Sequence, residues 1–317
     1  MKLTKRFCMI GAAAALSIST AVMAAPTFIN ILTGGTSGVY YPIGVALSQL
    51  YSNGIEGSKT SVQATKASVE NLNLLQAGRG ELALALGDSV SAAWEGDSEA
   101  GFKAPLKKLR VIASTYPNFI QIVANKDAGI NTLADLKGKR ISVGAPKSGT
   151  ELNARAIFAA AGLSYDDMGK VEFLPYAESV ELIKNRQLDA TLQSSGLGMA
   201  AIRDLAATMD INFVAIPEDV VAKINNPAYQ VGVITANTYE GQTEDVSTVA
   251  IQNLLVSHSK VSDDVAYQMT KLMFENLERL GTAHSAAQDI SLDKATKNLP
   301  IPLHPGAERY YKEVNAL

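Results

Sequence analysis

The chain has 317 residues, 28 of them basic and 31 acidic, and 47% of its residues are hydrophobic. A mildly acidic chain lacks the basic surface that nucleic-acid binding requires, and this length favours two lobes over a single core. The single cysteine, Cys8, lies close to the amino terminus. Beyond it we expect no disulfide and no cysteine metal site.

Residues 1–24 have the pattern of an export signal. Three basic residues precede an apolar segment at 7–22, which ends in the small-residue sequence Val-Met-Ala. We expect cleavage after Ala24, because a membrane anchor needs roughly 20 apolar residues with stop-transfer flanks. Cleavage removes three basic and no acidic residues and takes the net charge from −3 to −6. The sequence predicts a soluble exported protein, since no later segment reaches transmembrane length.

Short apolar strands alternate with amphipathic helices in the first part of the mature chain. We predict strands at 28–32, 61–65 and 82–86 and helices at 42–53 and 68–78. In the first helix Ile43, Leu47 and Leu50 share one face, and Pro42 suits its first turn. Gly78 is a typical residue at the end of the second helix. This alternation predicts an α/β fold with a mostly parallel sheet.

A second series of strands and helices begins near residue 119. We predict strands at 119–125, 139–145, 188–194, 211–216 and 229–235, a helix at 150–161 that ends before Gly162, and another after Gly198. From residue 236 the pattern indicates almost continuous helix to about residue 290. Extended segments bracket this second series, so we expect one lobe (119–229) to be inserted into another (25–118 and 230–317).

Five loops that follow predicted strands share one chemistry. Ligands of parallel α/β sheets bind at the carboxyl ends of the strands, and free N–H groups where the next helix begins favour an anion. The loops are 33–40, 65–68, 87–89, 146–150 and 194–198, rich in glycine and small hydroxyl residues. The candidate ligand-binding residues are Gly34, Thr36, Tyr40, Lys66, Ser68, Asp88, Ser89, Lys147, Ser148, Gly149, Thr150, Ser194 and Ser195.

Each candidate also has a structural interpretation. Ser68 is a typical helix N-cap, and Ser148 with Glu151 has the spacing of a capping box. Lys66 and Lys147 either contact a ligand carboxylate or are solvated. Asp88 either receives a ligand ammonium or hydroxyl or caps the helix that follows it. Among the aromatic residues Tyr40, Tyr41, Trp94 and Tyr176, we favour Tyr40 alone as a ligand contact, because it lies closest to a candidate loop.

Catalytic motifs are incomplete in this chain. Gly34 and Gly35 are not followed by the Gly-Lys of a phosphate-binding loop, and the sequence from Gly196 to Ala201 matches a dinucleotide fingerprint only in part. Gly87-Asp88-Ser89 is similar to the nucleophile block of some esterases, but none of the three histidines has the aspartate three residues earlier that completes it. We expect no enzyme, cofactor or metal site, and an exported hydrolase or transferase that uses Asp88 and Ser89 stays as the alternative.

Four segments resemble the TAXI-type solute receptors of TRAP transporters. They are 33–44 (TGGTSGVYYPIG), 67–75 (ASVENLNLL), 133–151 (LADLKGKRISVGAPKSGTE) and 300–313 (PIPLHPGAERYYKE). The resemblance implies a two-lobed periplasmic binding protein, type II-like, in which each lobe is a sheet flanked by helices and the ligand lies between them. It further implies capture of a small organic anion, such as glutamate, 2-oxoglutarate or 2-hydroxyglutarate, and its delivery to an ion-gradient-driven permease.

The resemblance also assigns residues and partners. The loop from Gly34 to Tyr40 and the helix start at Ser68 match ligand loops of the first lobe, and residues 148–150 match the loop of the second. The family usually has Gly-Gly where this chain has Lys66-Ala67, and glycine where it has Lys147. We expect a periplasmic monomer that contacts TRAP membrane subunits without inserting into the membrane and binds no nucleic acid. A role in ligand sensing for a signalling partner stays open.

Overall fold

The computed structural model describes residues 26–317, so the predicted export signal at 1–24 and Cys8 lie outside the described residues. The strands are β1 Thr27–Leu32, β2 Ser58–Gln63, β3 Leu82–Leu86, β4 Leu109–Asn125, β5 Arg140–Ser142, β6 Lys170–Glu172, β7 Ala190–Ser195, β8 Ile211–Val214, β9 Gln230–Ile234 and β10 Val246–His258. The helices are α1 Tyr40–Gly54, α2 Ser68–Ala77, α3 Gly87–Glu95, α4 Gly149–Ala160, α5 Tyr176–Lys184, α6 Ala200–Thr208, α7 Glu218–Ile224, α8 Asp263–Phe274, α9 Leu277–Ala283 and α10 Pro305–Glu313.

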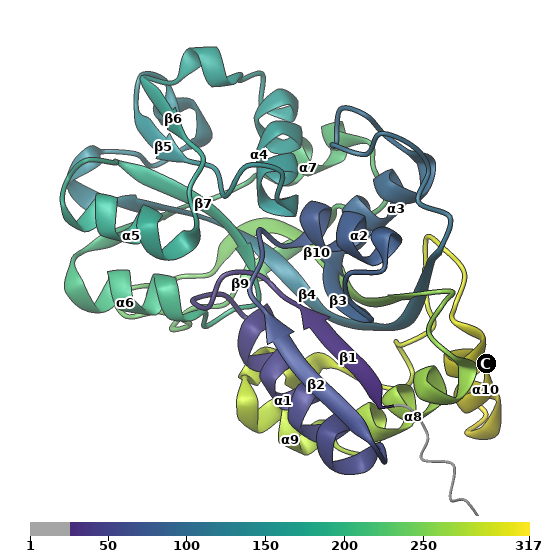
Figure 1. The fold of residues 1–317 in the computed structure, drawn as a ribbon. Coiled ribbons are helices and arrows are strands. Elements are labelled where there is room, and N and C mark those ends of the chain that lie inside the picture. Colours follow the sequence, from purple (N-terminus) through teal and green to yellow (C-terminus); the bar gives the residue numbers. More distant parts are fainter. Residues whose placement is uncertain (1–25) are drawn as a thin grey trace, which may run out of the picture.

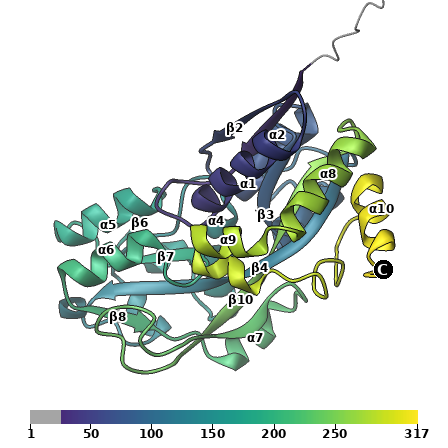
Figure 2. The ribbon, with the colours of Figure 1, turned by 90° about the horizontal axis from the view of Figure 1, so that it is seen from below.

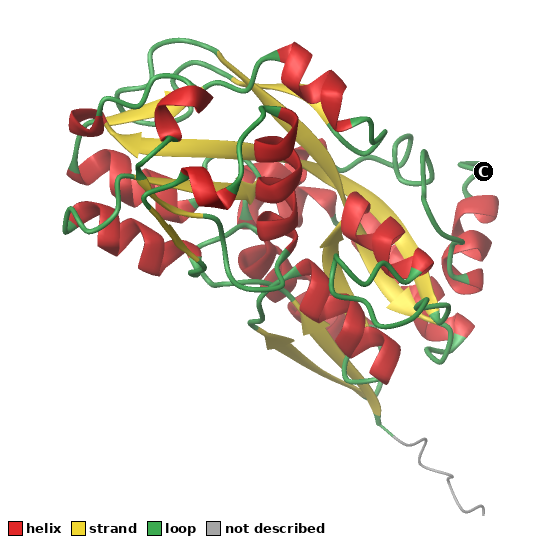
Figure 3. Cartoon of the chain, turned by 90° about the horizontal axis from the view of Figure 1, so that it is seen from above, coloured by secondary structure: helices red, strands yellow, loops and turns green. Residues whose placement is uncertain are grey.

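These strands form one sheet with helices on both faces (Figures 1 and 3). The strand order is β2-β1-β3-β10-β4-β7-β5-β6, with β8 paired to β4 and β9 paired to β10. The outer parts are parallel, since β1 pairs with β2 and β3, and β5 pairs with β6 and β7, in the same direction. The predicted α/β class with parallel βα units is confirmed.

The two long central strands connect these parallel parts. Residues 109–119 of β4 pair antiparallel with β10, whereas residues 119–124 pair with β7. Along β10, residues 246–250 pair with β9 and residues 253–256 with β3. Figure 2 shows β4 running from the part of the molecule that carries α8 and α10 to the part that carries α5 and α6. We keep the names first lobe (25–118 and 230–317) and second lobe (119–229) for the predicted division.

The prediction of nearly continuous helix from residue 236 to 290 was wrong for its first part. Residues 246–258 form β10, and helix begins only with α8. Most of β10 is buried on both faces, so its sequence VSTVAIQNLLVSH lacks the period-two alternation of a half-exposed strand. Short apolar runs without that alternation do not distinguish a buried strand from a helix.

The predicted apolar helix face packs into the core. Ile43, Leu47 and Leu50 of α1 are buried, and α2 ends before Gly78, whose φ of +71° is the left-handed conformation that glycine adopts without strain. The parallel strands β1–β3 run opposite to β5–β7, because β3, β10, β4 and β7 pair antiparallel in turn, so the strand-to-helix loops of each set lie at its own carboxyl edge. Within residues 26–317 no helix has both the length and the apolar character to cross a membrane.

Candidate ligand-binding site

A small cavity lies where the predicted loops of the two lobes meet. Its volume is about 130 Å³, similar to the ~150 Å³ of an engineered cavity that holds benzene. The structure brings eight of the candidate residues to its wall: Gly34, Tyr40, Lys66, Ser68, Ser148, Thr150, Ser194 and Ser195. These residues come from the carboxyl ends of β1, β2, β5 and β7, so strands far apart in the sequence contribute to one site.

Two helices begin at the cavity wall. The Ser68 hydroxyl, at the start of α2, accepts a hydrogen bond from the backbone N–H of Leu86 at 3.1 Å. Ser148 is the N-cap of α4, and its hydroxyl accepts from the N–H of Glu151 at 3.2 Å. Ser148 is therefore an N-cap, but the predicted capping box is incomplete, because the Glu151 side chain pairs with Arg155. The N-cap interpretation is wrong for Ser68, because Ala67 is the N-cap of α2. The positive ends of both helix dipoles favour an anion between them.

Tyr176 also lines the cavity, although the sequence analysis did not favour it. Its hydroxyl donates to the carbonyl of Ser194 at 2.8 Å and lies 2.5 Å from the hydroxyl of Thr150. Since Tyr176 has one proton to donate, Thr150 is the donor in the second contact. Burial raises the pKa of Tyr176, so it stays a neutral hydroxyl. The loop before Tyr176 follows β6 and carries Pro175 in place of glycine, so it lacks the glycine and hydroxyl pattern of the other loops.

Asn118 is a second cavity residue that the sequence analysis missed. It lies on β4 at the predicted lobe boundary, where its amide donates to the carbonyl of Ser194 at 3.0 Å. Its own carbonyl oxygen accepts from Asn253 at 2.7 Å, and Asn253 in turn accepts from the hydroxyl of Tyr40. A chain of hydrogen bonds thus connects both lobes beneath the cavity. The feature of the sequence that could have identified Asn118 is a polar residue within a mostly apolar strand.

Several polar groups at the cavity can form further hydrogen bonds. The Ser194 hydroxyl is buried and has no hydrogen-bond partner within residues 26–317. Within the described part of the chain the Ser195 hydroxyl accepts from the N–H of Val39 at 3.4 Å and donates to no protein group. Among the described lining residues, Lys66 is the one with a charged side chain, and it is exposed. The wall is otherwise uncharged, so hydroxyl and N–H donors and one cation face the cavity.

Five candidate residues lie outside the cavity wall: Thr36, Asp88, Ser89, Lys147 and Gly149. Thr36 and Lys147 are exposed, and Lys147 lines a different surface depression together with Glu151 and Arg155. Gly149 packs so closely on the first lobe that an added Cβ atom would lie 2.7 Å from the Ser68 hydroxyl. Gly149 therefore permits the close approach of α4 to Ser68 and Leu86.

Asp88 is buried and already has partners. Its carboxylate accepts from the Tyr229 hydroxyl and from the Asn153 amide, each at 2.8 Å, and from the N–H of Ser89 at 2.6 Å. Burial raises the pKa of this carboxyl, and the hydrogen bonds oppose that shift. The structure therefore gives Asp88 internal partners in place of the ligand ammonium considered from the sequence.

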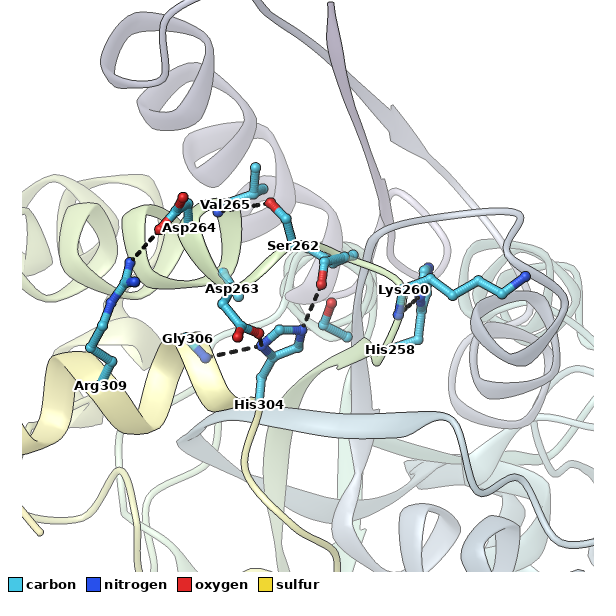
Figure 4. Close-up of polar contacts among 12 residues, drawn as sticks. His258, Lys260, Ser262, Asp263, Asp264, Val265, His304, Gly306 and Arg309 are labelled. Atoms are coloured by element: carbon cyan, nitrogen blue, oxygen red, sulfur yellow. Dashed lines mark hydrogen bonds and ion pairs between the residues drawn. The ribbon is translucent and has the colours of Figure 1, made fainter.

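The histidines serve packing and capping. His304, the N-cap of α10, accepts from the N–H of Gly306 through Nδ1 at 3.2 Å (Figure 4). Its Nε2 therefore carries the proton and donates to the carbonyl of Val261 at 3.1 Å. His258 has the same arrangement, with its Nε2 donating to the carbonyl of Gly80. His284 accepts from the N–H of Ala286 through Nδ1 at 3.1 Å. Within residues 26–317 no histidine therefore forms a hydrogen bond with Ser89, as the nucleophile and base of the hydrolase alternative would require.

Comparison with known proteins assigns the family. Residues 31–314 match the model of the NMT1-like family. The chain belongs to the NMT1-like family. It is similar in fold to a protein of Bordetella bronchiseptica RB50, with 13% identity, a TM-score of 0.59 and coverage of 91% of this chain and 98% of that one.

Two further solved structures have the same fold. PhnD1 from Prochlorococcus marinus MIT 9301, in complex with methylphosphonate, is 12% identical with a TM-score of 0.58 and coverage of 92% of this chain and 100% of that one. A binding protein component of an ABC phosphonate transporter from Pseudomonas aeruginosa is 14% identical with a TM-score of 0.53 and coverage of 84% and 80%. This NMT1-like protein thus has the fold of periplasmic solute-binding proteins, as predicted. These similarities do not extend to the TAXI type or to TRAP transporters, so that assignment stays a prediction.

Proposed function

We propose that this NMT1-like protein is a periplasmic receptor that captures one small organic anion between its lobes and delivers it to a membrane permease. The Ser194 hydroxyl carries the proposal, because it is buried at the cavity wall without a partner among the described residues. A buried hydroxyl without a hydrogen bond costs about 1–3 kcal/mol. A ligand oxygen in the cavity would remove that cost.

The charge of the wall supports an anion as the ligand. The α2 and α4 N-termini and Lys66 all contribute positive potential at the cavity. Ser68, Ser148 and Ser195 each accept a backbone hydrogen bond, so their hydroxyl protons remain to be donated. A carboxylate held by several such donors needs no arginine.

The contacts between the lobes support a closed conformation. The Val39 N–H donates to the Ser195 hydroxyl, and the Ala201 N–H donates to the carbonyl of Ser37 at 3.3 Å. Each contact joins a loop of the first lobe to the second lobe. A ligand that touches both lobes stabilises this closed form by its differential affinity, and the closed form would dock on the permease.

Within this function we propose a C5 dicarboxylate as ligand and a TAXI-type TRAP permease as partner. Two observations support this proposal: the four segments that resemble TAXI-type receptors, and the backbone conformation of two cavity-edge loops. Ala67 and Lys147, which replace glycines of those receptors, have φ of +70° and +58°, a conformation that glycine adopts without strain. Both loops thus have the positive-φ backbone conformation that glycine would adopt at these positions.

A phosphonate taken up by an ABC transporter is the second candidate. The structurally similar PhnD1 holds methylphosphonate, and a helix N-terminus binds a phosphonate as readily as a carboxylate. The hydroxyl and N–H donors and Lys66 at the cavity wall would bind a carboxylate or a phosphonate.

A ligand screen separates the candidates. The mature protein, refolded to remove carried-over ligand, is titrated in a thermal-shift assay with glutamate, 2-oxoglutarate, 2-hydroxyglutarate, C4 dicarboxylates, sialic acid and methylphosphonate. A ligand at 100 times its Kd adds about 2.7 kcal/mol of stability. A shift with a C5 acid alone supports the first candidate, and a shift with methylphosphonate alone supports the second. No shift with any of these anions withdraws the proposed ligand classes.

Two further experiments address the remaining alternatives. Incubation of the protein with small esters and amides tests turnover, because a receptor returns its ligand unchanged whereas a hydrolase does not. A pull-down of the liganded protein from solubilised membranes distinguishes a permease partner from a signalling partner.

A further inference from the structure

Asp88 lies where the two lobes face each other beside the ligand cavity. It belongs to the first turn of α3, directly after β3 of the first lobe, and only 7% of its surface is exposed. Its two partners from elsewhere in the chain, Asn153 and Tyr229, both belong to the predicted second lobe. A buried carboxylate of one lobe is thus held by donors from the other.

Both donors belong to the predicted second lobe, of which Tyr229 is the last residue before β9. Asn153 lies on α4 and is completely buried, and its amide also lies 2.9 Å from the Tyr229 hydroxyl. Tyr229 packs in the apolar cluster that contains Ile157 of α4 and Val221 of α7. Figure 1 shows α4 and α7 side by side. When the second lobe moves, we expect both donors to move with it.

None of the three side chains lines the ligand cavity. An effect of these residues on ligand binding would therefore act through the conformation of the protein. The carboxylate accepts two hydrogen bonds across the lobes and two contacts from Ser89 in its own lobe. If the lobes separated, the contacts to Asn153 and Tyr229 would be lost and the ones to Ser89 would stay.

We propose that Asp88, Asn153 and Tyr229 form a latch that stabilises the closed conformation whether or not the cavity is occupied. The proposal rests on the proposed function, because it assumes that the lobes open and close around a solute. Hydrogen bonds to a buried charged group are stronger than those between neutral groups, and removal of one donor leaves the carboxylate under-satisfied only in the closed form. Loss of the Tyr229 hydroxyl should therefore shift the ratio of open to closed molecules about tenfold toward open.

Pulsed electron paramagnetic resonance tests the latch without a ligand. Residues 26–317 contain no cysteine, so spin labels are attached at Asn53→Cys on α1 and Asn185→Cys after α5, two exposed positions in different lobes. The distance distribution is compared between the labelled parent protein and Tyr229→Phe. We expect a larger fraction of long distances in Tyr229→Phe.

Tyr165→Phe is the matched control. The Tyr165 hydroxyl also donates to a carboxylate, that of Glu151 at 3.0 Å, but both residues lie in the second lobe. We expect Tyr165→Phe to lose stability without changing the distance distribution. Equal distributions for Tyr229→Phe and the parent would overturn the latch, as would the same change in both tyrosine variants.

Asn153→Ala covers the case in which Tyr229→Phe does not fold. We expect the same shift toward long distances, with cooperative thermal unfolding as the check that the fold is intact; an unchanged distribution in this variant counts against the latch. Because the labels report on the ligand-free protein, a failed ligand screen would withdraw the proposed solute and leave this result to be judged separately.

Discussion

Ala67 and Lys147 lie at the starts of two cavity-lining helices: each has a positive φ, 70° and 58°, and each directly precedes a serine, Ser68 in the first turn of α2 and Ser148 at the N-cap of α4. The ψ of −144° at Ala67 lies near a region that is almost exclusive to glycine. Backbone strain is therefore stored at the edge of the candidate site, in both of its helix-starting loops.

Replacing these residues by glycine should stabilise the protein. We expect Ala67→Gly and Lys147→Gly each to raise the free energy of unfolding by about 1 kcal/mol, because the strain relieved exceeds the added entropy of the unfolded chain. Denaturant unfolding measures the change. Ala64→Gly, at a nearby exposed position whose φ is not positive, should destabilise. A fall in stability for Ala67→Gly as large as that for Ala64→Gly would contradict the role of strain.

Ser194→Ala should weaken ligand binding with little cost in stability. The hydroxyl has no partner within the described chain, so its loss leaves no protein group unsatisfied, whereas a bound ligand would lose about 1–3 kcal/mol of affinity. Isothermal titration with the ligand found in the screen measures this. In the control Ser142→Ala the lost hydroxyl lies 2.7 Å from that of Ser179, so stability should fall and affinity should not. Unchanged affinity in Ser194→Ala would place the ligand elsewhere.

The two lysines of the candidate loops should behave differently. Lys66→Ala removes the charged side chain at the cavity wall and should lower affinity by about 0.5–1 kcal/mol, less at high salt because Lys66 is exposed. Lys147→Ala should leave affinity unchanged, since Lys147 lines another depression. Titrations at low and high ionic strength compare the variants. A larger loss for Lys147→Ala would reverse the assignment.

Stability should fall as the pH decreases below about 6.5. Burial lowers the pKa of His258 and of His304 in the folded state, whereas in the unfolded chain both titrate near 6.5. Below that pH the unfolded chain binds protons before the folded one does, so the stability present above pH 6.5 is lost progressively. Thermal unfolding between pH 5 and 8 measures the slope. His304→Gln should lower stability and flatten this slope; an unchanged slope would argue against His304 as a contributor.

The βα units were accessible from the sequence because their signals are local. Pro42, the apolar face of α1 and Gly78 mark helix starts, faces and ends within one turn of chain, and the loops at 33–40 and 146–150 carry glycine and hydroxyl residues in an order that predicts strand ends. These loops contain much of the cavity wall. By contrast, β10 is buried on both faces and carries no periodic signal, so its strand state depends on the neighbours β3, β4 and β9.

By itself the sequence determined which loops follow parallel strands, and hence that glycine and hydroxyl residues gather at the carboxyl ends of those strands. Only the tertiary structure decided which side chains face the cavity. Tyr176, which follows a proline-containing loop, and Asn118, which lies on a buried strand, line the cavity. Asp88 instead accepts hydrogen bonds from Asn153 and Tyr229. Contacts of this kind join residues 65 to 141 positions apart. Local periodicity encodes which face of an element is buried, but it carries no information about which distant element will lie against that face.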